Sequence, residues 1–178
     1  MRPPWRSDAA VLLKGRNCER VHPFLFGNHV VTADEHRRWL EKRLAATDLP
    51  IFVFLQENKP LGMVNLTHFD KEHARGEWGF YIWTADAPKG AATAMLSAFL
   101  DELFLRRKLR KLCALALASN EKSLHLHKKL GFTQEGLLKE HVVKNGTPQD
   151  VVAFAIFDRD WRSKRKDFAA GIESVVFS

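Results

Sequence analysis

Residues 118–132 read ASNEKSLHLHKKLGF and carry the most informative pattern in the chain. They continue from Lys111–Ala118, an apolar run that is bounded as a buried strand should be. Asn120 is a good N-cap, and we expect a helix from there through Leu130. Gly131 is a natural C′ residue at which this helix ends. The pattern therefore predicts a buried strand that leads directly into a short helix.

One face of that helix is polar. Asn120, Ser123 and His127 are spaced i, i+3 and i+7, and residues with this spacing share a helix face. His125 and His127 cannot share a face, so they do not form an i, i+4 metal-binding pair. A histidine that stands alone on a helix is more often structural or exposed than functional, and this alternative stays open for His127.

A second helix start lies upstream, at Lys89-Gly90-Ala91-Ala92-Thr93, and this helix should run from Gly90 to about Arg107. Small residues let a ligand approach the backbone closely. The free N–H groups and positive dipole end of a helix can hold a phosphate, and Lys89 adds a charge. The segment is too short for a Walker A loop and lacks the GxGxxG dinucleotide pattern. The alternative is a plain helix start with alanines that favour helix.

The strand expected at Gly76–Trp83 presents two different faces. Alternation separates two sets of side chains, Glu77, Gly79 and Tyr81 on one face and Trp78, Phe80 and Ile82 on the other. A carboxylate and a phenol on one face of a central strand would be costly if buried without a purpose. Either this face is functional, or it is simply exposed.

The N-terminal part of the chain predicts a strand followed by a helix. The strand is expected at Ala9–Lys14. A capping box at Thr32–Glu35 begins a helix that runs to about Ala46. Three residues at helical spacing should face inward, namely Trp39, Leu40 and Leu44.

Four other strands complete the pattern: Ile51–Leu55, Leu61–Phe69, Phe132–Val143 and Val151–Phe157. The last two flank Asn145-Gly146, a strong hairpin turn signal. This order of elements predicts a mixed α/β domain that is neither doubly wound nor a sandwich.

Length and charge limit the class of protein. The 178 residues suggest one domain, or one domain plus a tail. We expect a domain at residues 1–161 and a basic tail at 162–178, in which Ile172–Phe177 could form an extra strand. The net charge of +7 suits nucleic acid, an anionic membrane face or a polyanionic small ligand. Nucleic-acid binding is disfavoured, because the chain lacks RNA-binding aromatic motifs and any helix-turn-helix or zinc signature.

The cysteines and the apolar runs indicate a compartment. Cys18 and Cys113 lie far apart and in no CxxC or Cys/His cluster, which indicates neither a disulfide framework nor a metal site. No run of 18 apolar residues predicts a membrane span, and Met1–Ala10 has no apolar signal region. We therefore expect a cytoplasmic protein with no metal and no membrane partner.

The combination of these segments resembles the acetyl-CoA-binding core of the GNAT superfamily of N-acetyltransferases. The resemblance covers about Leu12–Trp161 and is most specific at Ala118–Phe132. It implies a central, mixed, mostly antiparallel twisted sheet of about seven strands flanked by about four helices. It also implies acetyl-CoA as co-substrate.

Within the superfamily, several strings resemble the bacterial amino-sugar N-acetyltransferases of pseudaminic acid biosynthesis, the PseH type. They are Arg16-Asn17, Leu61-Gly62 with Asn65-Leu66-Thr67, Gly76–Tyr81, Asn120–Phe132, Glu135-Gly136 with Lys139-Glu140-His141, and Lys144–Val151. This implies acetylation of the 4-amino group of a UDP-linked 4-amino-4,6-dideoxy sugar, whose product is used to glycosylate flagellin.

The phosphate loop departs from the superfamily pattern, which usually reads Arg/Gln-x-x-Gly-x-Gly/Ala. Here Ala87 occupies the first position and Pro88 replaces a common glycine, while Gly90 and Ala92 keep the last two small positions. One side-chain contact to acetyl-CoA is therefore missing. Many members also carry a tyrosine where this chain has His127.

The resemblance implies two sets of contact residues. The acetyl-CoA site would be formed by Phe80, Tyr81, Ile82, Lys89, Gly90, Ala91, Ala92, Thr93, Asn120 and Ser123. Candidates for the nucleotide sugar are Arg16, His36, Thr67, His68 and Tyr81. Arginine suits bidentate phosphate contact, although each of these residues could instead be scaffold.

Three groups are the catalytic candidates. Glu77 would accept the amine proton directly or through a water. His127 would supply a proton to the departing thiolate, since its unperturbed pKa of about 6.5 suits either protonation state. By resemblance, a backbone N–H near Phe80 would bind the thioester oxygen.

Two alternatives within the same fold remain. One is an N-terminal protein acetyltransferase of the ribosomal-protein type, whose acceptor is a peptide. The other is a non-catalytic CoA-binding protein, which the departures at Ala87 and Pro88 would permit. A homodimer is possible in either case.

Overall fold

The protein is described here by a computed structural model that covers all residues except 176 and 178. Six strands form one sheet in the order β1-β2-β3-β4-β6-β5. Their bounds are β1 Ile51–Gln56, β2 Lys59–Asp70, β3 Arg75–Ile82, β4 Lys111–Leu117, β5 Thr133–Lys144 and β6 Thr147–Phe157. Neighbouring strands are antiparallel except β3 and β4, which are parallel. The predicted mixed and mostly antiparallel sheet is confirmed.

Six α-helices lie among the described residues: α1 Ala9–Asn17, α2 Ala33–Ala45, α3 Ala91–Asp101, α4 Glu121–Lys129, α5 Asp158–Lys164 and α6 Ala169–Glu173. A π-helical turn, Glu102–Arg106, continues α3, and a 3₁₀ turn, Arg165–Phe168, joins α5 to α6. Within this described part of the chain, no helix has the length and apolar content that crossing a membrane requires.

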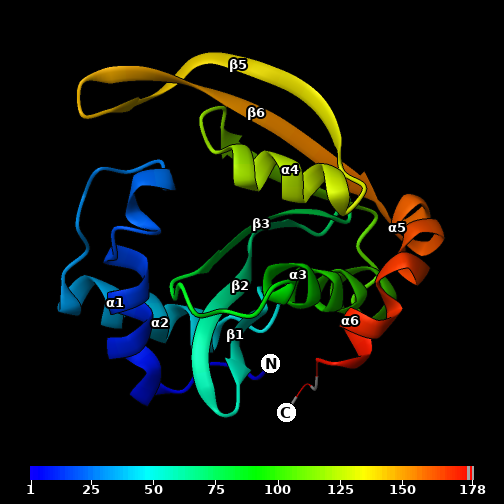
Figure 1. The fold of residues 1–178 in the computed structure, drawn as a ribbon, viewed down its shortest axis with the longest axis horizontal. Coiled ribbons are helices and arrows are strands. Elements are labelled where there is room, and N and C mark those ends of the chain that lie inside the picture. Colours follow the sequence, from blue (N-terminus) through cyan, green and yellow to red (C-terminus); the bar gives the residue numbers. More distant parts are fainter. Residues whose placement is uncertain (176, 178) are drawn as a thin grey trace.

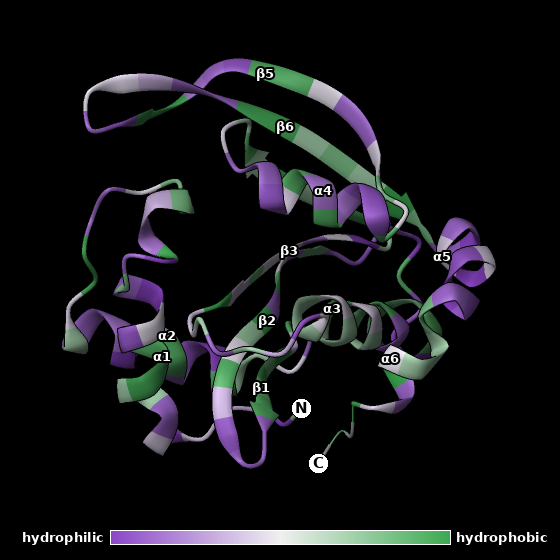
Figure 2. Ribbon diagram, viewed as in Figure 1, coloured by the Kyte–Doolittle hydropathy of each residue, from purple (hydrophilic) through white to green (hydrophobic). Residues whose placement is uncertain are grey.

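The sheet buries apolar side chains on both of its faces. The larger cluster joins α3 to β2, β3 and β6, with Phe99, Leu66 and Phe154 at most 1% exposed. On the other face α1 and α2 contribute Leu12 and Leu40, which pack with residues of β1 and β2. Figure 1 shows α1 and α2 on one side of the strands and α3, α5 and α6 on the other. Figure 2 shows hydrophilic colour over much of α4 and α5, as their exposed positions require.

Two local sequence motifs mark the ends of helices and strands as predicted. The Thr32 hydroxyl accepts from the Glu35 amide at 3.3 Å, and the Glu35 carboxylate accepts from the Thr32 amide at 2.8 Å. This is the predicted capping box at the start of α2. Asn145 and Gly146 both have positive φ, as a two-residue hairpin turn of type I′ requires.

The predicted strand at Ala9–Lys14 was wrong, because this segment lies in α1. Its two buried residues, Leu12 and Gly15, are three apart, which is a helical spacing and cannot place both on one face of a strand. Gly15 also lies directly against the Trp83 ring, where an added Cβ would come within 2.6 Å. The loss of this strand accounts for six strands instead of about seven.

Two smaller expectations also need correction. Leu44 is 38% exposed, and the inward positions of α2 are His36 and Leu40. Arg43 lies on this inner side of the helix instead, where its guanidinium donates to the Leu49 carbonyl at 3.2 Å. Ile172 lies in α6, so no strand begins there, and residue 176 of that expected strand is outside the described residues.

Candidate active site

A large cleft opens where β3 and β4 separate. The two strands are paired only from Arg75 with Lys111 to Glu77 with Cys113. Beyond Glu77 and Cys113 the two strands are no longer paired. A cleft of about 1140 Å³ is lined by both strands, by the N-terminal ends of α3 and α4, and by the segment that follows α1. A cleft at the separation point of two parallel strands exposes backbone groups that a continuous sheet would use for pairing.

One half of the cleft lies between the starts of α3 and α4. Gly90 has φ +92°, a left-handed conformation, and the first bond inside α3 runs from the Ala94 amide to the Gly90 carbonyl at 2.9 Å. The amides of Ala92 and Thr93 lie in the first turn of α3, before the residue whose amide makes that first bond, and both residues line the cleft. Their N–H groups and the positive end of α3 suit a pyrophosphate.

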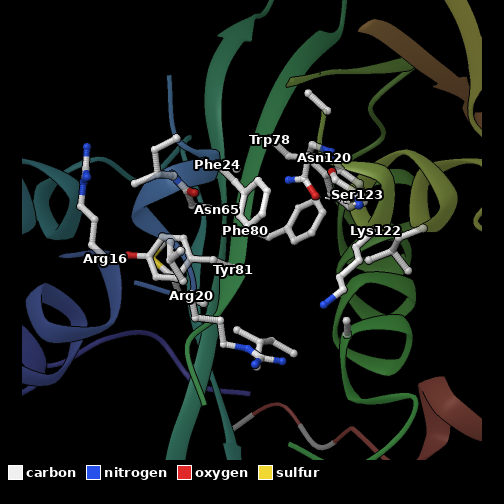
Figure 3. Close-up of a pocket in the computed structure, with 18 of the residues that line it drawn as sticks. Arg16, Arg20, Phe24, Asn65, Trp78, Phe80, Tyr81, Asn120, Lys122 and Ser123 are labelled. Carbon is white, nitrogen blue, oxygen red and sulfur yellow. Dashed lines mark hydrogen bonds between the residues drawn. The ribbon is translucent and has the colours of Figure 1, made fainter. Parts of the chain in front are cut away.

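Across from α3, the polar face of α4 lines the same half. Asn120 caps α4 by accepting the Ser123 amide at 3.1 Å, as expected. Lys122, which follows Asn120 by two residues, also lines the cleft. Figure 3 shows Asn120, Lys122 and Ser123 on one side of the cleft and Arg16, Arg20 and Tyr81 on the other.

The other half of the cleft is aromatic and basic. Its walls come from α1 and the turn after it, from Trp39 of α2, and from β2 and β3. The Nη1 atom of Arg16 is buried there and has no hydrogen-bond partner among the described residues. Burial raises the pKa of the Tyr81 phenol, so this side chain remains a neutral hydrogen-bond donor.

The predicted site residues fall into three groups. Those that line the cleft are Arg16, Thr67, Phe80, Tyr81, Ile82, Gly90, Ala91, Ala92, Thr93, Asn120, Ser123 and His127. Lys89 lines a separate, smaller hollow beside Met1 and Val175. His36, His68 and Glu77 do not line the cleft itself.

His36 lies behind the wall of the cleft. It is 1% exposed, and its ring lies 5.1 Å from that of Trp39, which does line the cleft. Neither ring nitrogen has a hydrogen-bond partner among the described residues. Burial, with a smaller effect from the Arg16 charge, lowers the pKa of His36, so the ring is neutral at physiological pH.

Glu77 and His127 lie on opposite faces of β3. The Glu77 carboxylate is 3.3 Å from Nδ1 of the exposed His68, on the face shared with Gly79 and Tyr81. His127 packs with Trp78 and Phe80 on the other face. The structure therefore does not bring the two predicted catalytic side chains together, although the faces of β3 are those that alternation predicted.

Several residues that line the cleft were not predicted as site residues: Glu19, Arg20, Val21, Phe24, Leu25, Phe26, Trp39, Asn65, Lys122, Leu115, Ala116 and Leu126. Half of them lie in the segment after α1, which has no motif. Arg20 lies in the turn beyond the end of α1 at Asn17, so helical spacing from Arg16 does not reach it, and no sequence signal marks it.

Comparison with known proteins adds an independent line of evidence. The model of the acetyltransferase (GNAT) domain family matches residues 1–133. The SPbeta prophage-derived uncharacterized N-acetyltransferase YokL of Bacillus subtilis is 28% identical over 127 residues, which is 70% of this chain and 71% of that protein. Spermidine N(1)-acetyltransferase of Escherichia coli K12 is 30% identical over 115 residues, 65% of this chain and 62% of the relative.

Among solved structures, the spermidine N-acetyltransferase from Vibrio cholerae in complex with CoA and spermine superposes with a TM-score of 0.84. The two sequences are 25% identical, and the alignment covers 90% of this chain and 96% of the other.

Proposed function

This chain belongs to the acetyltransferase (GNAT) family and is an acetyl-CoA-dependent N-acetyltransferase, and we propose that its acceptor is an amine on an anionic small molecule. The specific acceptor that we propose is a UDP-linked 4-amino-4,6-dideoxy sugar, acetylated at its 4-amino group for pseudaminic acid synthesis and flagellin glycosylation. Cys18 and Cys113 are both free thiols, which is consistent with the proposed location of the protein in the reducing cytoplasm.

The observation that supports an anionic acceptor is the Nη1 atom of Arg16, which is buried without a hydrogen-bond partner among the described residues. A buried donor without a partner is costly, and a ligand oxygen would relieve that cost. An arginine fork matches the oxygens of a phosphate group in a bidentate manner. Arg20 lines the same wall and adds a second positive charge.

The charge balance of the cleft argues against a polyamine acceptor. Among the described residues that line it, Glu19 is the one carboxylate, against the three cations Arg16, Arg20 and Lys122. A polycation needs carboxylates on the walls of its site, because burying an unpaired ammonium is costly. Spermidine nevertheless remains the second candidate, because the names of similar enzymes specify it.

Aromatic side chains suit the base and sugar of a nucleotide. Phe24, Phe26, Trp39 and Tyr81 all line the half of the cleft that holds Arg16. Base–aromatic stacking contributes about 1–3 kcal/mol per base. A cationic fork beside aromatic rings suits a nucleotide diphosphate. Thr67 also lines the cleft, and its hydroxyl, which donates to the Glu77 carbonyl at 3.0 Å, can still accept a hydrogen bond from a ligand.

For the chemistry, we propose that Glu77 is the base and acts through a water. Its side chain lies on the face of β3 that also carries Gly79 and Tyr81, both of which line the cleft. The amine nitrogen attacks the thioester carbon, and the C–S bond breaks with its electron pair on sulfur. The proton leaves the amine through the water to Glu77. The unpaired backbone of β3 near Phe80 would bind the developing oxyanion.

The test measures CoA release from acetyl-CoA with four acceptor conditions: the UDP-linked amino sugar, spermidine, an N-terminal peptide, and none. We expect turnover with the nucleotide sugar. Arg16→Gln should raise the KM for that acceptor about 10- to 100-fold, since a hydrogen bond to a charged group contributes about 1.5–3 kcal/mol. The KM for acetyl-CoA should not change. Arg38→Gln, at an exposed position of α2, is the control.

Turnover with spermidine alone would replace the proposed acceptor by a polyamine. Turnover with the peptide alone would make the protein a ribosomal-protein-type enzyme. If no acceptor supports turnover while acetyl-CoA still binds, the nucleotide-sugar proposal fails and a CoA-binding role without catalysis takes its place.

A further inference from the structure

Trp78 and His127 connect β3 to α4 in the half of the cleft between the starts of α3 and α4, which we assign to acetyl-CoA. Trp78 follows Glu77, the last residue of β3 that pairs with β4. Its indole Nε1 donates to Nε2 of His127, on α4, at 3.2 Å. On the other side of the ring, Nδ1 of His127 lies 2.7 Å from the Ser123 carbonyl oxygen. A chain of hydrogen bonds therefore connects the point where β3 leaves β4 to the helix opposite.

The two partners fix the state of the imidazole. The Ser123 carbonyl can only accept, so Nδ1 of His127 must carry the hydrogen. The indole N–H of Trp78 can only donate, so Nε2 must present its lone pair. A proton on Nε2 would set two donors against each other. In this arrangement Nε2 carries no proton that could be transferred to the thiolate of CoA. The proton on Nδ1 is already donated in a hydrogen bond to the Ser123 carbonyl.

The surroundings of the ring agree with that neutral state. His127 is 2% exposed and is surrounded by Trp78, Phe80, Phe132 and Phe154, with the Phe154 ring stacked at 5.2 Å. Burial lowers the pKa of His127 to about 4, with a smaller opposing effect of the Ser123 carbonyl. No charged side chain contributes to this shift.

We propose that Trp78 and His127 form a neutral clamp that holds α4 against β3 and sets the width of the acetyl-CoA slot, so that His127 is a positioning residue instead of the proton donor expected from the sequence. The inference rests on the acetyltransferase activity alone and holds whatever the acceptor is. The thiolate of CoA then leaves unassisted and takes its proton from water. This is feasible because a free thiol has a pKa of about 8.5.

The test compares two variants in steady-state kinetics with the acceptor that supports turnover. Trp78→Phe keeps a ring and removes the donor, so the KM for acetyl-CoA should rise about tenfold with kcat within about threefold. His127→Gln offers an amide oxygen to the Trp78 indole but has no titrating group, so kcat should stay within about fivefold. Trp5→Phe, at an exposed tryptophan, controls for the substitution itself.

A proton donor would behave differently, because its removal costs about 10²–10⁴-fold in rate and abolishes one limb of the pH–rate profile. Loss of that size in His127→Gln would overturn the clamp. The imidazole of the unaltered protein provides a second measurement, which needs no variant to fold. Nitrogen-15 NMR should show the Nδ1–H tautomer of His127 with no titration between pH 5.5 and 8, and titration near neutrality would also overturn the proposal.

Discussion

Glu77 and Cys113 are the last residues through which β3 pairs with β4. Their position explains the site, because beyond Glu77 one edge of β3 is no longer paired with β4 and borders the cleft, while the other edge stays paired with β2. Trp78 to Ile82 all line the cleft. The catalytic proposal therefore concentrates on five consecutive residues and on the carboxylate that precedes them.

Removal of the Glu77 carboxylate tests its proposed role as the base. Glu77→Gln keeps the size of the side chain and should lower kcat about 10²–10⁴-fold. The KM for acetyl-CoA should be unchanged, because Glu77 does not line the cleft. Glu135→Gln is the matched control, since this carboxylate lies on β5 in an exposed ion pair with Lys111. A loss below tenfold in Glu77→Gln would leave proton removal to solvent.

The left-handed glycine at the start of α3 provides a second prediction. Gly90 has φ +92° and Gly146, in the distant hairpin turn, has φ +79°, and an added Cβ meets nothing within 4 Å at either. Alanine at each position should therefore cost about 1–2 kcal/mol of stability through backbone strain alone. Only Gly90→Ala should also raise the KM for acetyl-CoA, because only that strain distorts the phosphate loop. Urea unfolding and steady-state kinetics of both variants measure the two effects.

Equal kinetic effects of Gly90→Ala and Gly146→Ala would contradict this assignment of the loop. The departures at Ala87 and Pro88 make the comparison informative, since this loop has no arginine or glutamine side chain there to compensate. On the proposed assignment, backbone amides and the start of α3 would form the contact with the pyrophosphate.

The buried imidazole of His127 predicts a specific pH dependence of stability. Its folded pKa of about 4 lies below the unfolded value of about 6.5, so the unfolded chain binds more protons between these values. The stabilisation is fully present above about pH 6.5 and is lost as the pH falls towards 4. The free energy of unfolding should drop by about 3 kcal/mol over that range from this residue.

His36 shifts stability in the same direction, because burial lowers its pKa as well. The contribution of His127 is therefore measured as the difference in pH slope between the unaltered protein and His127→Phe, by urea unfolding at pH 4.5, 5.5 and 7. The unaltered protein should lose more stability than the variant on acidification. Parallel slopes would show that the ring is solvated and free to titrate.

The sequence predicted those parts of the fold whose signal lies within a few neighbouring residues. The N-cap at Asn120, the capping box at Thr32 and the hairpin turn at Asn145-Gly146 are fixed by neighbouring residues, and all three are present. The segment Ala9–Lys14 carries no cap or turn that distinguishes helix from strand. Its helical form depends on packing against β1 and β2, which a short apolar run does not reveal.

The same distinction applies to the site. Asn120, Ser123 and His127 were found because helical spacing alone places them on one face of α4. Arg20 and Phe24 were missed, since they reach the cleft only through the path of the chain in three dimensions. Lys122 was missed although it lies on α4, because it falls outside the i, i+3, i+7 pattern that was used. The state of His127 was also beyond a sequence argument, because it depends on Trp78, 49 residues away in the chain.

The packing of the last segment of the chain bears on where the domain ends. Residues 162–178 were expected to be a basic tail, yet part of them packs on α3. Arg165 donates to the Asp101 carboxylate at 2.6 and 3.0 Å, and the Trp161 indole donates to the same carboxylate at 2.8 Å. The Phe168 ring stacks on Trp161 at 5.7 Å and is 9% exposed.

Deletion of residues 162–178 should therefore destabilise the protein, since loss of a buried phenylalanine alone costs about 3–5 kcal/mol. Phe168→Ala should reproduce most of the loss in urea unfolding. Arg162→Ala should not, because its exposed pair with Asp158 contributes at most about 1 kcal/mol. If the deleted form instead unfolds at the same urea concentration as the full chain, residues 1–161 form the folded unit and the segment is an appendage. Destabilisation would extend the domain through Phe168 and make Asp101 the residue that anchors its end.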